Sequence, residues 1–188
     1  MEEKLKQHSA NCIKIVLFGP ESTGKTTLSE QLARYYSSVW VPEYAREYLQ
    51  NKWNNERKTC EPDDLLPIAI GQMTLENNLA QKTDSVLICD TDLLETKVYS
   101  EAYYNGTCHP LLEKYALQNE YDLYFLTYID TPWEADDLRD KPHERERMFK
   151  AFENALITHN KNYVLLKGTL KERLQEATKH IDKLLNKK

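Results

Sequence analysis

The chain has no long apolar run, no closely spaced pair of cysteines and no surplus of positive charge. No stretch approaches the roughly 20 apolar residues that a transmembrane helix needs, and the polar start MEEKLKQHSANC lacks the apolar core of a secretory signal. Zinc sites and disulfide frameworks need cysteines that are paired or closely spaced, whereas here they stand at Cys12, Cys60, Cys89 and Cys108. These absences predict a cytoplasmic protein with free thiols and no membrane association.

The net charge of −5 also argues against nucleic acid as a partner, because proteins that bind nucleic acid usually present a basic face to the phosphates. The 188 residues fit one compact domain, and 40% of them are hydrophobic, which is enough for a core. No Gly/Ser-rich linker, internal repeat or low-complexity tract divides the chain. We therefore expect a polar, solvated leader over residues 1–11 and a single domain over residues 12–188.

Short apolar segments alternate with segments of helical periodicity. Strands are expected at residues 12–18, 38–41, 85–89, 123–129 and 163–166, and helices at 25–36, 62–82, 92–104, 110–118, 144–159 and 170–186. Strands that alternate with helices predict a parallel sheet covered on both faces. The fold class expected is α/β, with three layers around a five-stranded parallel sheet.

The segment GPESTGKT, residues 19–26, matches the pattern G-x-x-x-x-G-K-[ST] between a predicted strand and a predicted helix. Such a loop wraps its N–H groups around a phosphate, its Lys reaches the β- and γ-phosphates, and its Ser or Thr hydroxyl binds Mg²⁺. The alternative is a glycine turn that only joins a strand to a helix. The predicted nucleotide contacts are Gly19, Glu21, Ser22, Thr23, Gly24, Lys25, Thr26 and Thr27, with Lys25 catalytic and Thr26 a metal ligand.

A P-loop also needs a carboxylate for its Mg²⁺, usually at the end of a neighbouring strand. In VLICDTD, Asp90 directly follows the apolar strand and Asp92 stands two residues later. Asp90 is the predicted metal ligand and a catalytic candidate. Asp92 is a candidate for substrate binding, with a helix cap as the alternative.

The segment PEYAREYL follows the second expected strand, at the edge where open α/β sheets place their ligands. Glu43 is a candidate to accept the proton of an attacking hydroxyl, and Arg46 to hold an acceptor group or a phosphate. Tyr44, between them, is the third candidate for substrate binding. A surface Glu–Arg pair on a short helix is the alternative.

In the segment DDLRDKPHERERMF, the side chains of Arg139, Lys141, Arg145 and Arg147 gather positive charges among Asp and Glu residues. A basic segment at this place in the chain is suited to close over ATP as a lid, and Arg139 and Arg145 are the catalytic candidates within it. The alternative is a solvated helix face on which Glu and Arg alternate. Gly168 follows the fifth expected strand, where a backbone loop is placed to pack on the adenine.

Together the blocks FGPESTGKTTL, PEYAREYL, AIGQMTLENNLA, ICDTDLLETKVYSEAYYNG and the segment from His109 to Arg147 resemble the ribosylnicotinamide kinase domain of NadR-like NAD-biosynthesis proteins. The resemblance covers about residues 13–168. It implies that Mg-ATP phosphorylates the 5′-hydroxyl of nicotinamide riboside to give nicotinamide mononucleotide. It also implies the phosphate and Mg²⁺ roles for Gly24, Lys25 and Thr26, and matches Asp90, Glu43, Arg46, Arg139 and Arg145 to family segments.

Two alternatives stay open. Pro42 and Leu65 stand where family members can carry aromatic residues, so another small nucleoside is a second candidate for the acceptor. An ATP-binding switch that regulates a partner is the other, although the chain lacks the guanine-reading motif N-K-x-D. The sequence leaves open the oligomeric state, a homo-oligomer included, and regulation by NAD or related metabolites.

Overall fold

A computed structural model describes residues 2–138 and 143–187 of the chain. Five strands form one parallel sheet in the order β2-β3-β1-β4-β5. Their bounds are β1 Ile13–Phe18, β2 Trp40–Val41, β3 Val86–Cys89, β4 Leu123–Thr127 and β5 Tyr163–Leu166. Each expected strand is present, and β2 is shorter than expected because only two of its residues pair with β3.

The central strand, β1, is buried along its whole length. Its side chains alternate between the two faces of the sheet, so that Ile15 and Leu17 enter one core cluster while Val16 and Phe18 enter another. A strand that is covered on both faces is apolar over most of its length, which explains the run IVLF, and the buried Lys14 of this strand is paired with Glu76.

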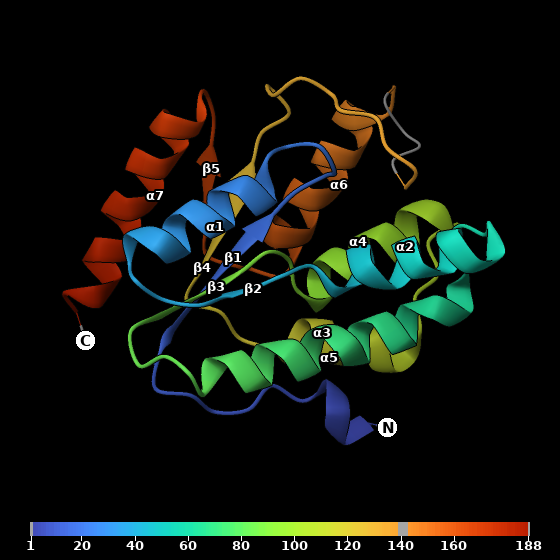
Figure 1. Ribbon diagram of the computed structural model, residues 1–188, viewed down its shortest axis with the longest axis horizontal. Coiled ribbons are helices and arrows are strands. Elements are labelled where there is room, and N and C mark those ends of the chain that lie inside the picture. The colour runs from blue at the N-terminus through green and yellow to red at the C-terminus, as the bar shows by residue number, and fades with distance from the viewer. Residues whose placement is uncertain (1, 139–142, 188) are drawn as a thin grey trace.

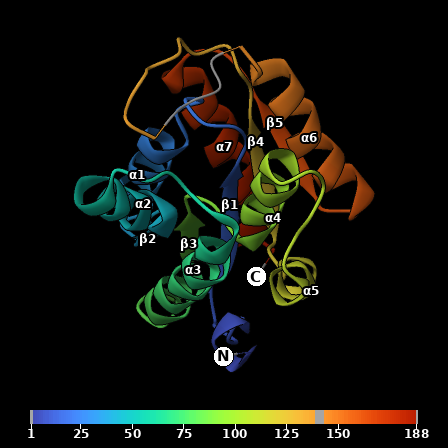
Figure 2. The ribbon, with the colours of Figure 1, turned by 90° about the vertical axis from the view of Figure 1, so that its right-hand side faces the viewer.

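Seven α-helices are seen in the described part of the chain. They are α1 Lys25–Tyr35, α2 Tyr44–Glu56, α3 Leu65–Ala80, α4 Leu93–Tyr103, α5 Pro110–Gln118, α6 Arg145–Thr158 and α7 Leu170–Leu185. On one face of the sheet α1 and α7 pack against β1, and on the other face α4 and α6 do so (Figures 1 and 2). The expected three layers are therefore confirmed.

One helix, α2, was not among the helices predicted from periodicity. None of its residues is fully buried, so its sequence YAREYLQNKWNNE shows no continuous apolar stripe. It packs mainly on α3, which runs beside it (Figure 1). The long helix expected at 62–82 also differs slightly, because residues 62–64 form a 3₁₀ turn before α3 begins.

Most residues of the N-terminal segment are exposed to solvent, but the segment is also docked on the domain through Leu5. Residues 2–5 form a 3₁₀ helix, and the side chain of Leu5 is completely buried in a cluster with residues of α3 and α5. The backbone N–H of His8 donates to Asn77 Oδ1 (2.8 Å), and Gln7 Nε2 donates to Glu76 Oε1 (2.8 Å). One apolar residue among polar neighbours is too weak a pattern to reveal such packing.

All five strands run in the same direction, so their C-terminal ends meet at one edge of the sheet. The segments after β1, β2, β3 and β4 all begin there, and these carry most of the predicted site residues. None of the helices in the described ranges combines the length and apolar character that crossing a membrane requires.

Candidate nucleotide and acceptor site

The loop between β1 and α1 has the backbone conformation of a phosphate loop. Gly19, Ser22 and Gly24 all have positive φ angles, of 142°, 58° and 82°. A Cβ atom on Gly19 would lie 2.7 Å from Thr127 Oγ1, so glycine is required there by both conformation and space. Thr23 Oγ1 donates to the Pro20 carbonyl at 2.8 Å and lies 2.7 Å from Thr127 Oγ1. These contacts hold the loop in place while α1 points its N-terminus at the loop.

Lys25 is buried at the start of α1 and is surrounded by oxygen atoms. Its Nζ donates to the carbonyls of Gly19 (2.5 Å) and Pro20 (3.2 Å), and lies 3.1 Å from Glu95 Oε1. Burial opposes the positive charge, but the carboxylates of Glu95, Glu43 and Asp90 together raise the pKa of Lys25. The ammonium is therefore charged at neutral pH and available to a phosphate.

The pair Thr26 and Asp90 fits a magnesium site. Thr26 Oγ1 donates to Asp90 Oδ2 at 2.6 Å, and Asp90 Oδ1 has no hydrogen-bond partner among the residues that the structure describes, although the side chain is 1% exposed. Burial, and then the charge of Glu43, raise the pKa of Asp90 to about 6. Hard oxygen donors suit Mg²⁺, which keeps several waters and takes phosphate oxygens as further ligands. In the described ranges no three acidic, His or Cys side chains converge on a single metal position.

The turn after β3 separates the roles of its two aspartates. Thr91 has a φ of 117°, a conformation that costs energy in a residue with a Cβ and that is concentrated at functional sites. Asp92, on its far side, caps α4: Oδ1 accepts from the Glu95 N–H (2.9 Å) and Oδ2 from the Tyr124 hydroxyl (2.7 Å). Both oxygens are engaged and the side chain is 1% exposed. Asp92 is thus a buried cap outside the wall of the large cavity, and the cap interpretation accounts for both of its oxygens.

A cavity of about 1080 Å³ opens beside the phosphate loop. Its walls include the loop from Glu21 to Thr27, the strand-end residue Asp90 and the segment Pro42–Glu47. Glu43, half-buried at the start of α2, lies in this wall together with Tyr44 and Arg46. The Tyr44 ring packs so closely on Gly71 of α3 that a Cβ there would lie 2.1 Å from it. The structure therefore brings the loop residues Glu21 to Thr27 and the acceptor candidates Glu43, Tyr44 and Arg46 to one cavity, whereas Gly19 and Asp92 lie outside its wall.

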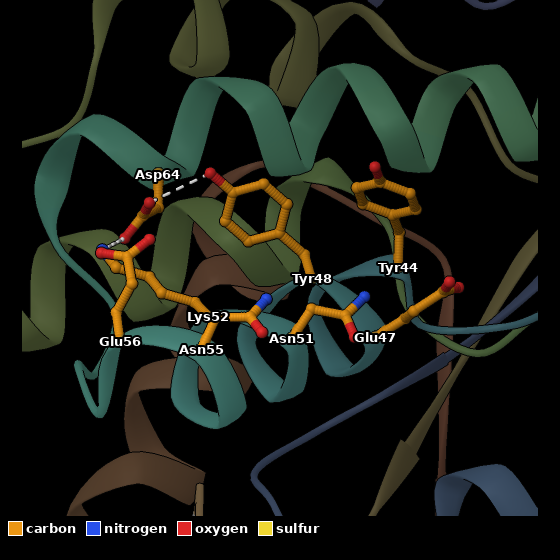
Figure 3. Close-up of a pocket in the computed structure, with 8 residues that line it drawn as sticks. All are labelled: Tyr44, Glu47, Tyr48, Asn51, Lys52, Asn55, Glu56 and Asp64. Carbon is orange, nitrogen blue, oxygen red and sulfur yellow. Dashed lines mark hydrogen bonds and ion pairs between the residues drawn. The ribbon is translucent and has the colours of Figure 1, made fainter.

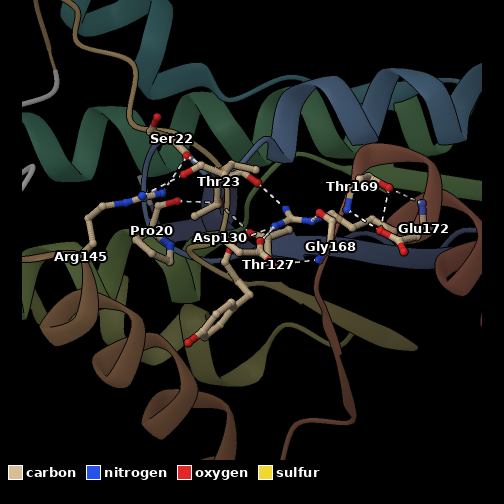
Figure 4. Close-up of polar contacts among 12 residues, drawn as sticks. Pro20, Ser22, Thr23, Thr127, Asp130, Arg145, Gly168, Thr169 and Glu172 are labelled. Atoms are coloured by element: carbon tan, nitrogen blue, oxygen red, sulfur yellow. Dashed lines mark hydrogen bonds and ion pairs between the residues drawn. The ribbon is translucent and has the colours of Figure 1, made fainter.

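The segment after β4 is tied to both sides of this cavity. Arg145, the first residue of α6, donates to the carbonyls of Thr131 (2.9 Å) and Ser22 (3.1 Å) (Figure 4). Arg46 donates to Asp136 at 2.5 Å, so its guanidinium is held by this segment. Arg145 thus contacts the phosphate loop, and its lid role stays a prediction. Arg139, the other candidate, and Lys141 lie outside the described residues, and their lid role stays a prediction.

Arg173 of α7 anchors the phosphate loop through the Thr23 carbonyl. This residue was not identified from the sequence. This α7 side chain is 3% exposed and donates to the carbonyls of Thr23 (2.6 Å), Tyr128 (2.9 Å) and Gly168 (3.1 Å), besides pairing with Asp130. Asp130 in turn accepts from the Gly168 N–H (2.6 Å), an arrangement around Gly168 and Thr23 that Figure 4 displays. Gly168 therefore lies near the loop through Arg173, although it is not in the cavity wall.

Glu95 is a second residue that the motifs did not reveal. It stands one helical turn after the cap Asp92, and its side chain is buried in the cavity wall beside Lys25. Burial raises the pKa of Glu95 well above its ordinary value, Lys25 lowers it, and Glu43 and Asp90 raise it further. Nothing in the sequence distinguishes it from a solvent-exposed Glu in the first turn of a helix.

A smaller cavity of about 430 Å³ lies between α2 and the beginning of α3. Figure 3 shows Tyr48 and Lys52 of α2 reaching towards Asp64. The Tyr48 hydroxyl donates to Asp64 Oδ1 (3.1 Å) and Lys52 Nζ to Oδ2 (2.6 Å). These polar groups bind one another, so this cavity is better explained as the packing of α2 on the rest of the domain.

A parallel sheet in this order, with a phosphate loop after its central strand and a strand-end aspartate facing it, defines a kinase-like P-loop domain that binds ATP. A family model described as AAA domain matches residues 14–173, and the chain belongs to that family. It is also 29% identical over 143 residues to the trifunctional NAD biosynthesis/regulator protein NadR of Salmonella typhimurium (strain LT2). That match covers 76% of this chain and 34% of the relative's length.

Solved structures agree on the fold. A crystal structure of NadR protein in complex with NR has a TM-score of 0.78 at 24% identity, over 93% of this chain and 52% of that one. A second NadR structure, in complex with NAD and AMP-PNP, has a TM-score of 0.70 at 22% identity and covers 91% of this chain and 48% of that one. Deoxyadenosine kinase from M. mycoides with bound dATP has a TM-score of 0.62 at 16% identity, over 90% and 99%. The resemblance to NadR-like proteins is therefore confirmed, and the fold is that of P-loop kinases.

Proposed function

We propose that this protein phosphorylates the 5′-hydroxyl of nicotinamide riboside with ATP, giving nicotinamide mononucleotide and ADP. The observation that supports this most is the joining of a complete phosphate loop and a large acceptor cavity that is lined by Glu43 and Tyr44. NadR, to which the chain is related, has been crystallised with NR and, separately, with NAD and AMP-PNP. A cavity of this size suits a nucleoside beside the triphosphate of ATP.

In this proposal the protein mainly positions its substrates. The N–H groups of the loop and the Lys25 ammonium bind the phosphates, and Thr26 and Asp90 hold the Mg²⁺, which neutralises charge on the transferring group. Glu43 orients the acceptor hydroxyl and receives its proton. Arg145, fixed against Ser22 and Thr131, adds positive charge at the mouth of the loop. Little covalent participation is required, because phosphoryl transfer depends chiefly on positioning and electrostatics.

A second acceptor is favoured by a specific observation. Pro42 and Leu65, which replace residues that can be aromatic in the family, both lie in the wall of the large cavity. An aliphatic pair offers less stacking to a flat base than two aromatic rings would. A different small nucleoside is therefore the competing substrate, with the same phosphate chemistry.

The proposal is tested by ADP release from Mg-ATP with nicotinamide riboside, uridine, cytidine, adenosine or thymidine, and without an acceptor. We expect turnover that depends on an acceptor and is fastest with nicotinamide riboside, and we expect the variant Lys25→Ala to be inactive with all of them. Lys6→Ala is a matched control, because Lys6 forms only an exposed pair with Glu3.

Fastest turnover with another nucleoside transfers the proposal to that substrate. ADP release that is equal with and without acceptors contradicts nucleoside phosphorylation and favours an ATP-binding switch. Full activity of Lys25→Ala contradicts the assignment of the phosphate loop itself.

A further inference from the structure

Glu95 is the acidic side chain of the cavity that directly contacts the P-loop lysine. Its side chain is 3% exposed, its Oε1 lies 3.1 Å from Lys25 Nζ, and its Oε2 has no hydrogen-bond partner among the residues that the structure describes. Glu95 nevertheless belongs to the wall of the large cavity. A buried carboxylate oxygen that has no donor is costly, and a ligand in the adjoining cavity is one source of that donor.

We propose that Glu95 binds a hydroxyl group of the acceptor sugar and thereby sets the acceptor next to Lys25. This inference rests on the proposed function and adds to it a substrate-binding residue outside the P-loop and the Glu43 segment. A carboxylate accepts hydrogen bonds and a protonated carboxyl also donates one. A sugar hydroxyl both donates and accepts, so it matches Glu95 in either form.

The charges around Glu95 favour a hydroxyl over a phosphate. Glu43 and Asp90 raise the pKa of Glu95, which means that both lie close enough to add negative charge at this end of the cavity. One ammonium, that of Lys25, stands against these three carboxylates. Phosphate is repelled by such a cluster unless a metal ion intervenes, whereas an uncharged hydroxyl is attracted to it.

The neighbouring residues leave this role to Glu95. Asp92, which lies on the same turn, uses both carboxylate oxygens within the protein. Asp90 Oδ2 accepts from Thr26, and its unpartnered Oδ1 is assigned to the proposed Mg²⁺ site. Farther along the wall stand Leu65 and Ile68, whose side chains donate no hydrogen bonds. Because Lys25 contacts the β- and γ-phosphates in P-loop enzymes, a hydroxyl bound at Glu95 lies at the reacting end of the acceptor.

The test compares Glu95→Leu, which has a similar size but no acceptor atom, with Glu95→Gln, which keeps one neutral acceptor oxygen. With the best acceptor from the nucleoside panel, we expect Glu95→Leu to raise the acceptor KM about tenfold or more, the usual effect of losing a hydrogen bond to a charged group. Glu95→Gln should recover part of that loss. The KM for ATP should stay within about twofold in both, because Lys25 keeps its two carbonyl contacts.

Glu101→Gln serves as the matched control, since Glu101 lies on the same helix, pairs with Lys97 and is 37% exposed. It should leave both KM values unchanged. Circular dichroism and thermal unfolding of each variant separate loss of fold from loss of binding, and Glu95→Gln, which is nearly isosteric, keeps the test valid if Glu95→Leu does not fold.

An unchanged acceptor KM in Glu95→Leu and Glu95→Gln overturns the inference, and so does a rise confined to the KM for ATP, which would show that Glu95 acts on Lys25 alone. Either result leaves the kinase proposal standing if the wild type turns over. If the wild type phosphorylates no hydroxyl acceptor, the proposed function fails first and this inference falls with it.

Discussion

Arg173 offers the sharpest test of how this site is held together. Its guanidinium joins three carbonyls, of Thr23, Tyr128 and Gly168, and the carboxylate of Asp130. It therefore ties α7 to the phosphate loop and to the ends of β4 and β5. In Arg173→Met the apolar stem remains, but these buried acceptors lose their donor and Asp130 loses its partner.

The size of the effect follows from burial. Removing one partner of a buried ion pair costs about 3–5 kcal/mol. The Arg173 side chain is 3% exposed but that of Asp130 is 30% exposed, so solvent recovers part of the carboxylate's hydration and we expect the lower end, about 3 kcal/mol. For a chain of this length that corresponds to a fall in Tm of about 6–12 °C.

Thermal unfolding followed by circular dichroism, with urea unfolding at 25 °C, measures this change. We also expect weaker ATP binding, because Thr23 of the phosphate loop loses its anchor. Arg34→Met is the matched control: Arg34 is 81% exposed and 3.8 Å from Glu30, so its loss should cost less than about 0.5 kcal/mol. A difference in Tm of about 2 °C corresponds to about 0.5–1 kcal/mol. If the Tm of Arg173→Met lies within this difference of the control's Tm, the anchoring role is refuted.

Two further predictions concern stability. Burial opposes ionisation of Asp64, but hydrogen bonds from Lys52, the Glu61 N–H and Tyr48 outweigh it and lower the pKa of Asp64. Ionised Asp64 therefore stabilises the folded state above the unfolded-state pKa of about 3.9, and this stabilisation is lost as the pH falls through the lower folded-state pKa. The free energy of unfolding should accordingly change less in Asp64→Asn than in the wild type between pH 5 and pH 3, about the window set by these two pKa values. If urea unfolding gives the same dependence of the free energy on pH in both proteins, the prediction is contradicted. Leu5→Ala should lower the free energy of unfolding by about 2–4 kcal/mol, because the side chain is completely buried. Leu117→Ala, at a position that is 36% exposed, should cost less, and equal losses in the two variants would show that the N-terminal segment does not contribute to the core.

The parts of the fold that could be predicted are those in which one residue type repeats at short range. The run IVLF of β1 must be apolar on both faces, and the five strands were all found by this property. The same reasoning failed for α2, which buries none of its residues fully, and for Leu5, a single apolar residue whose partners lie on α3 and α5. Periodicity detects an element that buries a continuous face and misses one that docks through isolated contacts.

The same distinction applies to the site. Gly19, Gly24, Lys25 and Thr26 lie within eight residues of one another, and Asp90 directly follows a strand, so local spacing was enough to select them. Asp92 could be a cap or a ligand on spacing alone, and only the Tyr124 hydroxyl and the Glu95 N–H decide for the cap. Arg173 reaches Thr23 across 150 positions of sequence, a contact that follows from tertiary packing and from no motif.

The strand order explains why the two halves of the site are electrostatically joined. Because β3 lies between β1 and β2, the residues that follow these strands meet around Lys25: the phosphate loop after β1, Glu43 after β2, and Asp90 and Glu95 after β3. The carboxylates of these acceptor-side and metal-side residues all contribute to the pKa of Lys25. A substitution at any one of them removes its own contact and also shifts the pKa of Lys25, while the two carbonyl contacts of Lys25 stay in place. Groups this close do not contribute additively, so the KM values for the two substrates must be measured separately to assign the role of each residue.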